Sequence, residues 1–217
     1  MKIRNKIIFL IPAKNEEKNI KNVLLKFKKY GKPIVVNDHS ADKTLDISKK
    51  FSYKVLNLKN KNGYDAAIKY GLKYIINNIS GKFIISIDAD GEHSPVYLSK
   101  FIKKLKNNYL IIGNRHKYNR WSEYICSLVS YFFFSIKDPL CGMKCYDLNY
   151  LKKNKKKIIE KLDFDVDNCG MFFFKIYNLK YVSNITIRTN NINRKSNFGN
   201  GILVNLKIIK CFLKSIF

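Results

Sequence analysis

A repeated alternation between short apolar runs and helix-like segments constrains the fold of this chain more than any other feature. The apolar runs are IIFLI (7–11), PIVVN (33–37), YKVLNL (53–58) and KFIISI (82–87). Helical spacing follows each run, beginning near residues 16, 41, 64 and 95. Because nearly uninterrupted apolar strands alternate with helices in sheets covered on both faces, the pattern predicts an α/β fold with a Rossmann-like, mostly parallel sheet flanked by helices.

The length of the chain predicts a single domain. At 217 residues, of which 46% are apolar, the chain can bury one full core, and no linker or repeat divides it. Beyond residue 115 the alternation loosens into a predicted helix over 121–136, a Lys-rich patch over 152–157 and a predicted helix around 166–178. Right-handed crossovers bring the C-terminal ends of parallel strands to one edge, so we expect ligands to bind just after the strands.

The charge of the chain predicts partners that carry phosphate. Forty-two Lys and Arg against sixteen Asp and Glu give a formal net charge of +26, which attracts nucleotides, anionic lipids or nucleic acid. A composition rich in Lys, Asn and Ile also follows from an AT-rich genome. Charge alone therefore does not choose among these partners.

The cysteines and the apolar segments predict a compartment. Five cysteines without a CxxC pair fit reduced thiols in the cytoplasm, and the histidines are not spaced for a structural zinc site, so we expect no zinc. The N-terminal apolar run of about six residues is too short for a signal peptide. No apolar stretch reaches the roughly 20 residues of a spanning helix, so we expect no membrane crossing.

Two carboxylates, Asp88 and Asp90, stand one residue apart at the end of the fourth predicted strand. Two negative charges this close favour a bound cation, and carboxylate oxygens suit Mg²⁺ or Mn²⁺ at a diphosphate site. Glu92 and His93 follow as further ligands or as partners of the ligands. A helix-capping loop is the alternative explanation of this motif.

The segment Asn37-Asp38-His39-Ser40 follows the second predicted strand. An acidic side chain at that position can accept hydrogen bonds from a ribose or from the N–H edge of a base. The alternative is a cap, supplied by Asp38 or Ser40, for the helix predicted to begin near Ala41.

Three segments together, 11–17, 35–44 and 88–93, resemble the family 2 glycosyltransferases of GT-A fold, especially the dolichyl-phosphate and polyprenyl-phosphate sugar transferases. The resemblance runs from about residue 6 to residue 200. It implies a nucleotide-sugar-binding half over 1–115 and an acceptor-binding half over 116–200. It also accords with an amphipathic, membrane-associated helix over 201–217, where Lys207, Lys210 and Lys214 recur at helical steps; an ordinary helix packed on the core is the alternative.

The resemblance assigns roles on the donor side. The residues expected to contact the nucleotide sugar there are Pro12, Ala13, Asn15, Glu16, Asp38, Gly63 and Asp88. The residues expected to bind metal are Asp88, Asp90 and Glu92. Asn37, where the family has an acid, and Tyr64 and Asp65, where it has small residues, depart from the pattern.

The resemblance also assigns roles nearer the acceptor. Arg115 would hold a phosphate, Asp138 would orient a sugar hydroxyl, and Arg194 and Ser196 lie in a basic loop that would close over the diphosphate. Asp165 and Asp167 match an acidic helix start. The predicted catalytic residues are Asp90, Arg115, Asp138 and Asp167. The alternative for Arg115 is an ordinary surface arginine, and the alternative for Asp165 and Asp167 is a helix N-terminus that favours carboxylates. The alternative for the loop of Arg194 and Ser196 is a solvated basic turn.

The implied reaction is an inverting transfer from a UDP- or GDP-sugar, assisted by Mg²⁺ or Mn²⁺, at the cytoplasmic face of a membrane. A polyprenyl-phosphate acceptor is already largely ionised at pH 7 and needs no base. A glycan hydroxyl would need one, for which Asp167 or Asp165 is the candidate.

Three other interpretations stay open from the sequence. A basic nucleic-acid-binding protein would explain the charge and the aromatics, but no nucleic-acid-binding motif accompanies them. A nucleotidyltransferase would share the alternating fold but carries a Gly-rich basic N-terminal loop that is absent from this chain. The third is a degenerate family member, for which Asn37 and Tyr64 are the reason.

Overall fold

The computed structural model describes residues 6–60, 63–162, 167–189 and 201–217. One seven-stranded sheet runs through the molecule in the order β3-β2-β1-β4-β6-β5-β7. The strands are β1 (Ile7–Ala13), β2 (Lys32–Asn37), β3 (Lys54–Asn57), β4 (Phe83–Ser86), β5 (Leu110–Arg115), β6 (Lys144–Asp147) and β7 (Val182–Ile187).

The sheet is parallel except at β6, which pairs antiparallel with both β4 and β5. The other pairings, including that of β7 with β5, are parallel. The prediction of a mostly parallel sheet in a single domain is thus confirmed, and all four strands read from the alternation are present. Neither β6 nor β7 was predicted.

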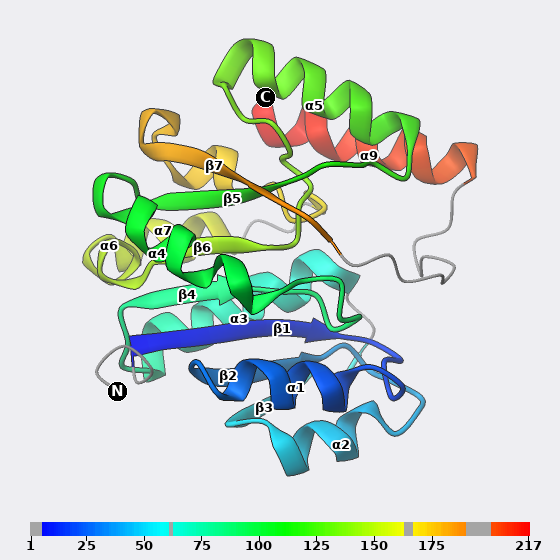
Figure 1. The fold of residues 1–217 in the computed structure, drawn as a ribbon. Coiled ribbons are helices and arrows are strands. Elements are labelled where there is room, and N and C mark those ends of the chain that lie inside the picture. Colours follow the sequence, from blue (N-terminus) through cyan, green and yellow to red (C-terminus); the bar gives the residue numbers. More distant parts are fainter. Residues whose placement is uncertain (1–5, 61–62, 163–166, 190–200) are drawn as a thin grey trace.

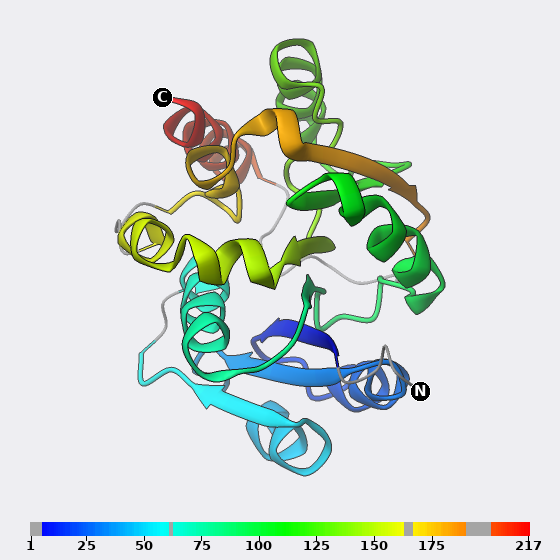
Figure 2. The same ribbon diagram turned by 90° about the vertical axis from the view of Figure 1, so that its left-hand side faces the viewer.

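Helices cover both faces of the sheet, with α1 and α4 on one side and α3 and α7 on the other (Figure 2). The helices are α1 (Ile20–Lys28), α2 (Thr44–Phe51), α3 (Gly63–Asn78), α4 (Leu98–Lys104), α5 (Trp121–Phe134), α6 (Leu148–Lys153), α7 (Lys155–Leu162), α8 (Phe173–Ile176) and α9 (Ile202–Ile216). Short 3₁₀ turns, η2 (Pro95–Tyr97), η3 (Leu105–Asn107) and η4 (Leu179–Tyr181), extend three of these connections.

Several predicted helices have other limits in the structure. The Lys-rich patch lies in α6 and α7. The helix predicted around 166–178 shrinks to α8, because Cys169 and Gly170 both adopt positive φ, at 49° and 79°, and form a turn instead. Helix α5 stops at Phe134, where Ser135 takes a left-handed conformation.

The core includes the apolar side chains of β1, β2 and β4, almost all of which are buried, and it extends through β5, β6 and the helices that cover the sheet. Helices α5 and α9 lie side by side at one end of the molecule (Figure 1), joined by a hydrogen bond of 3.2 Å from the Ser122 amide to Asn205 Oδ1. Among the described residues, no helix combines the length and the apolar character needed to cross a bilayer.

Candidate functional site

The polar segments that follow the strands meet at one edge of the sheet. Strands β1, β2, β4 and β5 end there because they run in one direction, and the loop 138–143 reaches the same edge because β6 runs in the other. The three motifs read from the sequence and the loop before β6 therefore surround one site.

The loops after β1 and β2 hold each other in place. Asn15 adopts a positive φ of 53°, its amide donates to Ser40 Oγ at 3.1 Å, and its Oδ1 accepts from the Ala41 amide at 2.9 Å. The Glu16 amide donates to Thr44 Oγ1 at 2.7 Å. These contacts give Asn15 and Glu16 a firm position at the rim of the site.

Asp38 is buried at this edge of the sheet and is only 3% exposed. Its amide donates to the Ala13 carbonyl at 2.9 Å, next to Pro12 at the end of β1. Its carboxylate accepts from the Gly63 amide at 3.1 Å and lies 3.4 Å from Lys14 Nζ. The structure thus gathers Pro12, Ala13, Asp38 and Gly63, four of the predicted nucleotide-binding residues.

Asp88 points out of the end of β4 over the backbone of Gly142. A Cβ on Gly142 would lie 2.2 Å from Asp88 Oδ2, so the carboxylate occupies space that only glycine leaves open. The side chain of Asp88 is 31% exposed, which leaves it accessible to a ligand. Glycine in the loop before β6 is therefore a condition for the position of Asp88.

His93 supports Asp88 from behind. The Asp88 amide donates to His93 Nδ1 at 3.1 Å, and the imidazole is buried. Burial lowers the pKa of His93, and the nearby Arg115 and Lys144 lower it further against the opposing effect of Asp88. His93 is therefore a neutral acceptor that fixes the backbone of the first carboxylate of the motif.

Asp90 closes a turn with Gly91 at a φ of 89°, and its Oδ1 accepts from the Glu92 amide at 3.0 Å. Asp88 and Asp90 are both part-exposed, oxygen-only donors on one loop, which is the chemistry that Mg²⁺ and Mn²⁺ require. In the described part of the chain, Asp88, Asp90 and Glu92 do not form a close three-ligand group. The residues thus fit a cation held by two carboxylates, with its other ligands supplied by diphosphate and water.

Tyr64 is a site residue that the sequence suggested only as a departure from the family. Its ring packs on Gly170, where a Cβ would lie 3.0 Å from Tyr64 Cε1. Burial, and then the neighbouring Asp88 carboxylate to which it hydrogen-bonds, raise the pKa of Tyr64 well above its ordinary value. Tyr64 is therefore a permanent neutral donor to Asp88.

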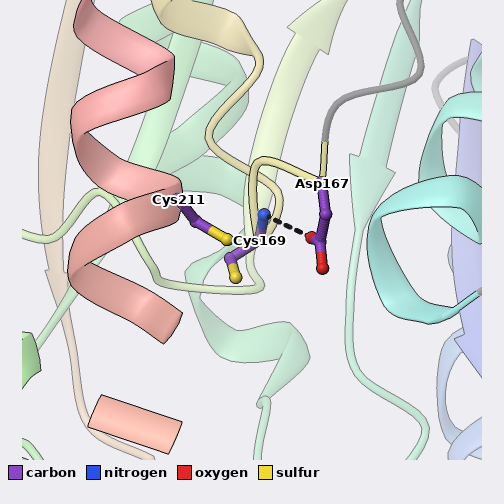
Figure 3. Close-up of side chains that lie close together, drawn as sticks. All are labelled: Asp167, Cys169 and Cys211. Carbon is purple, nitrogen blue, oxygen red and sulfur yellow. Dashed lines mark hydrogen bonds between the residues drawn. The ribbon is translucent and has the colours of Figure 1, made fainter. Parts of the chain in front are cut away.

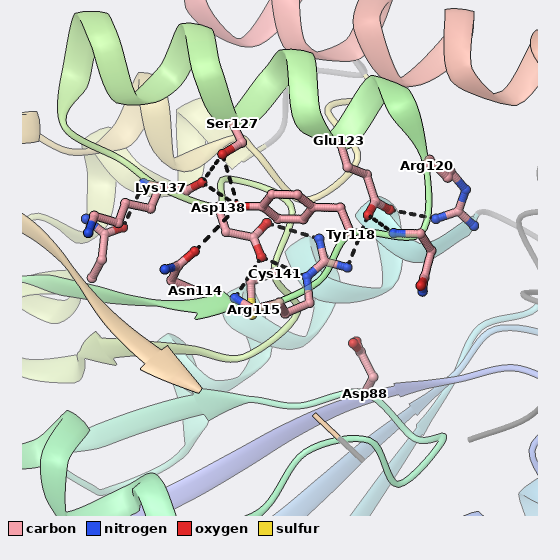
Figure 4. Close-up of polar contacts among 12 residues, drawn as sticks. Asp88, Asn114, Arg115, Tyr118, Arg120, Glu123, Ser127, Lys137, Asp138 and Cys141 are labelled. Carbon is pink, nitrogen blue, oxygen red and sulfur yellow. Dashed lines mark hydrogen bonds and ion pairs between the residues drawn. The ribbon is translucent and has the colours of Figure 1, made fainter. Parts of the chain in front are cut away.

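Arg115 and Asp138 form a two-pronged ion pair on the other side of the site (Figure 4). Arg115 Nε donates to Asp138 Oδ2 at 2.7 Å, and Arg115 Nη2 donates to Asp138 Oδ1 at 3.0 Å. Arg115 Nη1 lies 3.5 Å from Glu123 Oε2, and Glu123 Oε1 lies 2.7 Å from Arg120 Nη1. Burial alone would lower the pKa of Arg115, but Asp138 outweighs it and holds that pKa well above the usual range.

Lys144, at the start of β6, is a buried cation that was not among the predicted catalytic, nucleotide-binding or metal-binding residues, although it ends the segment that begins at Asp138. Its Nζ donates to the Cys141 carbonyl at 2.5 Å and lies 5.6 Å from the centre of the Phe173 ring. Burial lowers its pKa, although Cys141, Asp138 and Asp88 act against that shift. The unexpected antiparallel strand β6 brings this lysine to the site.

Asp167 lies apart from these residues, beside α9. Its Oδ2 is 2.8 Å from Lys207 Nζ, and its Oδ1 accepts from the Cys169 amide at 3.0 Å. Burial would raise its pKa, but the hydrogen bonds from Lys207 and Cys169 lower it overall. The remaining predicted positions, Asp165, Arg194 and Ser196, lie outside the described residues.

An open groove with a volume of about 710 Å³ runs from the Arg115 end of the site along α5. Polar and cationic side chains line one part of it, and the aromatic and aliphatic side chains of α5 line the rest. The lining residues are Asn114, Arg115, His116, Tyr118, Tyr124, Ile125, Ser127, Leu128, Tyr131 and Lys137. The groove is therefore amphiphilic.

Comparison with protein families and relatives gives consistent matches. A model of the family Glycosyl transferase family 2 matches residues 8–179. An uncharacterized protein of Methanocaldococcus jannaschii is 34% identical over 173 residues, 69% of this chain and 75% of that protein. The UDP-N-acetylglucosamine–dolichyl-phosphate N-acetylglucosaminyltransferase of Methanococcus voltae is 33% identical over 135 residues, 52% of this chain and 53% of that protein.

Solved structures share the architecture. Glucosyl-3-phosphoglycerate synthase from Mycobacterium tuberculosis, solved with Mn²⁺, uridine diphosphate and glucosyl-3-phosphoglycerate, superposes with a TM-score of 0.66. The match covers 98% of this chain and 80% of that one at 15% sequence identity. At this identity the likeness supports the fold alone.

Proposed function

The chain belongs to glycosyl transferase family 2 and has the GT-A fold, and from that premise we propose that it transfers a sugar from a UDP- or GDP-sugar to a polyprenyl-phosphate-type acceptor at a membrane surface. The observation that carries the acceptor assignment is the amphiphilic groove beside Arg115. A phosphate with an attached prenyl chain has the same division into an anionic head and an apolar body.

The donor would bind across the edge formed by Pro12, Ala13, Asn15, Glu16, Asp38 and Gly63. Asp88 and Asp90 would hold Mg²⁺ or Mn²⁺, which neutralises charge that develops on the leaving diphosphate. A relative and a structural neighbour are consistent with this half: the M. voltae relative is named for a UDP-sugar donor, and the M. tuberculosis structure, which shares the fold, was solved with Mn²⁺ and uridine diphosphate. Glu92, Arg194 and Ser196 remain proposed contacts of the same donor.

Tyr64 and Lys144 would stabilise the negative charge of the Asp88 carboxylate. Tyr64 keeps its proton and donates to the carboxylate, while the buried Lys144 ammonium lies close enough to affect the site electrostatically. These fixed groups stabilise negative charge without reorganising during the reaction. Arg115 keeps its positive charge at the head of the acceptor groove, and Asp138 compensates part of that charge.

An inverting transfer to a phosphate acceptor suits the environment of Asp167. A phosphomonoester is largely dianionic at pH 7 and attacks without a base. The candidate base for a glycan hydroxyl was Asp167 or Asp165, and for Asp167 the hydrogen bonds from Lys207 and the Cys169 amide lower the pKa and so weaken it as a base. This favours the lipid phosphate over the glycan hydroxyl.

The paired helices α5 and α9 support the membrane part of the proposal. Helix α5 buries mostly polar side chains, such as Ser122 and Ser130, and exposes Trp, Leu, Tyr and Phe side chains. Helix α9 buries Ile208 and Phe212 beside the polar Asn205 and exposes several Ile and Leu side chains. Lys207, Lys210 and Lys214 are exposed on α9 among these apolar residues. Exposed aromatics mixed with cations are typical of surfaces that lie on anionic membranes.

The test is sugar transfer from a panel of UDP- and GDP-sugars to a short-chain polyprenyl phosphate, with Mg²⁺ or Mn²⁺, by the wild type and by Asp90→Ala. Asp46→Ala, on the exposed face of α2, is the matched control because it removes an exposed carboxylate that is none of the proposed metal, donor or acceptor residues. Metal-dependent transfer that only Asp90→Ala loses supports the proposal. Transfer to a glycan and not to the lipid phosphate would identify a glycan hydroxyl as the acceptor. Binding of nucleic acid without binding of a nucleotide sugar would overturn the proposal.

A further inference from the structure

Two cysteines and an aspartate that the sequence keeps far apart meet between α9 and the turn before α8 (Figure 3). The ligand atoms of Asp167, Cys169 and Cys211 all lie within 4.8 Å of one another. Ligands of a tetrahedral zinc site, with bonds of roughly 2.0–2.3 Å, lie about 3.5–4 Å apart, so small side-chain rotations suffice to close the group on one ion.

The backbone already holds these ligands in position. Cys169 adopts a positive φ of 49°, and its amide donates to Asp167 Oδ1 at 3.0 Å. The Gly170 amide donates to the buried Asp65 at 2.9 Å. Asn168 Nδ2 donates to Ser215 Oγ at 3.0 Å and ties the turn to α9. The turn is therefore set by its own contacts, independently of any ion.

The three ligand residues differ in their exposure to solvent, and this difference suits a metal site. Cys211 is buried on α9, Cys169 is half-buried and the side chain of Asp167 is 49% exposed. Solvent can thus reach the site from the Asp167 side and supply a fourth ligand. Two sulfur donors select soft or borderline cations over Mg²⁺.

We propose that Asp167, Cys169 and Cys211 bind a soft or borderline divalent cation of the Zn²⁺ type, which cross-links the 167–170 turn to α9. This reverses the expectation of no zinc, which rested on spacing along the chain. The site is distinct from the Asp88–Asp90 loop, whose donors are oxygen only.

The ammonium group of Lys207 already lies on the carboxylate side of this site. Lys207 Nζ lies 2.8 Å from Asp167 and its side chain is 55% exposed, so it can swing into solvent when an ion binds. The ammonium repels an incoming divalent ion. Removal of Lys207 should therefore strengthen metal binding about thirtyfold, the scale of the repulsion between a monovalent and a divalent cation at a solvated distance of about 4 Å.

The test is Co²⁺ titration of the full chain, kept reduced and free of oxygen, with Zn²⁺ added afterwards. We expect the thiolate-to-cobalt absorption band to saturate at one Co²⁺ per chain and to be abolished by Zn²⁺, while any Co²⁺ held by Asp88 and Asp90 adds nothing to this band. Cys211→Ala should lose the band, Lys207→Gln should show the higher affinity, and Cys145→Ala, a buried cysteine of β6, should leave the band unchanged. Asp88→Asn should also leave it unchanged, because oxygen donors give no such band.

The gain of affinity in Lys207→Gln keeps the test decisive, since misfolding does not strengthen a site. Absence of a thiolate band in the folded wild type would overturn the proposal. A band that survives Cys211→Ala, or one that disappears in Asp88→Asn, would also overturn it by placing the metal elsewhere. Sugar transfer is not needed for any of these readouts, so they stand apart from the proposed reaction.

Discussion

Helices α1 and α5 distribute their side chains in opposite ways. Helix α1 buries Ile20, Val23, Leu24 and Phe27 and turns its lysines to solvent. Helix α5 buries Ser122, Glu123, Cys126 and Ser130, and exposes apolar side chains such as Leu128 and Phe132. In the region of β1–β4, α1 thus uses its apolar residues for the core, whereas in the region from β5 onward α5 presents many of its apolar residues outward, where they are available to a partner.

The two regions also hold their polar site residues differently. In the first region, neutral hydrogen bonds between loops fix Asn15 and Glu16. In the second region, a buried ion pair fixes Arg115 against Asp138. Predictions that target one region at a time can therefore break or sharpen the contrast.

The largest effect should follow from Asp138→Ala. Removal of one partner leaves Arg115 buried with part of its charge uncompensated, so the free energy of unfolding should fall by about 3–5 kcal/mol. Thr44→Val, which removes the acceptor of the buried Glu16 amide in the first region, should cost about 1–3 kcal/mol. Denaturant unfolding of both variants measures the difference.

A double variant separates charge from packing in this prediction. Arg115→Met in the Asp138→Ala background should restore part of the lost stability, because it removes the uncompensated charge. Equal losses in Asp138→Ala and Thr44→Val, or no recovery in the double variant, would mean that the two regions are held in the same way.

The next largest effect should come from Gly142→Ala, which acts across the boundary between the regions. The added methyl would lie 2.2 Å from Asp88 Oδ2, and the flexible carboxylate would move aside while the fold remains. A displacement of about 1 Å at a catalytic group costs on the order of a hundredfold in rate. Sugar transfer should therefore fall about a hundredfold with a higher metal requirement.

Gly201→Ala is the control for this substitution, since nothing lies within 4 Å of its added methyl. We expect it to keep wild-type transfer. If Gly142→Ala also kept wild-type transfer and metal dependence, the position of Asp88 over Gly142 would have no catalytic importance.

A smaller effect is expected on the exposed face of α5. Leu128 and Phe132 are 72% and 79% exposed, so Leu128→Ser and Phe132→Ser should leave the free energy of unfolding almost unchanged. Each should weaken binding to anionic vesicles about tenfold through the apolar area that no longer enters the bilayer. Vesicle co-sedimentation measures this binding.

Val96→Ser tests whether exposure alone explains such an effect, because Val96 is 67% exposed but belongs to the first region. It should leave vesicle binding unchanged. Equal losses from Val96→Ser and Phe132→Ser would remove the distinction between the surfaces of the two regions.

The contrast between the regions also explains what the sequence could predict of the fold. In the first region, continuous apolar runs and helical spacing record the core directly, so β1 to β4 were all predictable. Strand β6 is only four residues long and depends on antiparallel pairing with distant strands, which leaves no periodic signal. The composition of α5 indicates a helix, but its packing decides which side faces solvent.

The site divides along a similar line. Asp38, Asp88 and Asp90 follow strands in recognisable motifs and were predictable by position. His93, five residues after Asp88, was expected as a ligand or as a partner of the ligands, and it accepts the hydrogen bond of the Asp88 amide. The support that Tyr64 gives to Asp88, and the burial of Lys144 near it, depend on contacts between distant segments. The meeting of Cys169 and Cys211 likewise follows from the docking of α9 and not from spacing along the chain.

The smallest expected effect concerns pH and the neutral hydrogen bonds of the first region. Burial lowers the pKa of His93, so between that value and the ordinary pKa of about 6.5 the unfolded chain binds a proton that the folded chain does not. The free energy of unfolding should therefore fall, on the order of 1 kcal/mol, as pH decreases below about 6.5.

His93→Asn retains an acceptor for the Asp88 amide but does not titrate, so its stability should lack this component of the pH dependence. Denaturant unfolding of both proteins between pH 5 and 8 measures the difference. Parallel pH profiles for the wild type and His93→Asn would show that protonation of His93 is not coupled to folding, and that the carboxylate of Asp88 does not depend on a neutral imidazole beneath it.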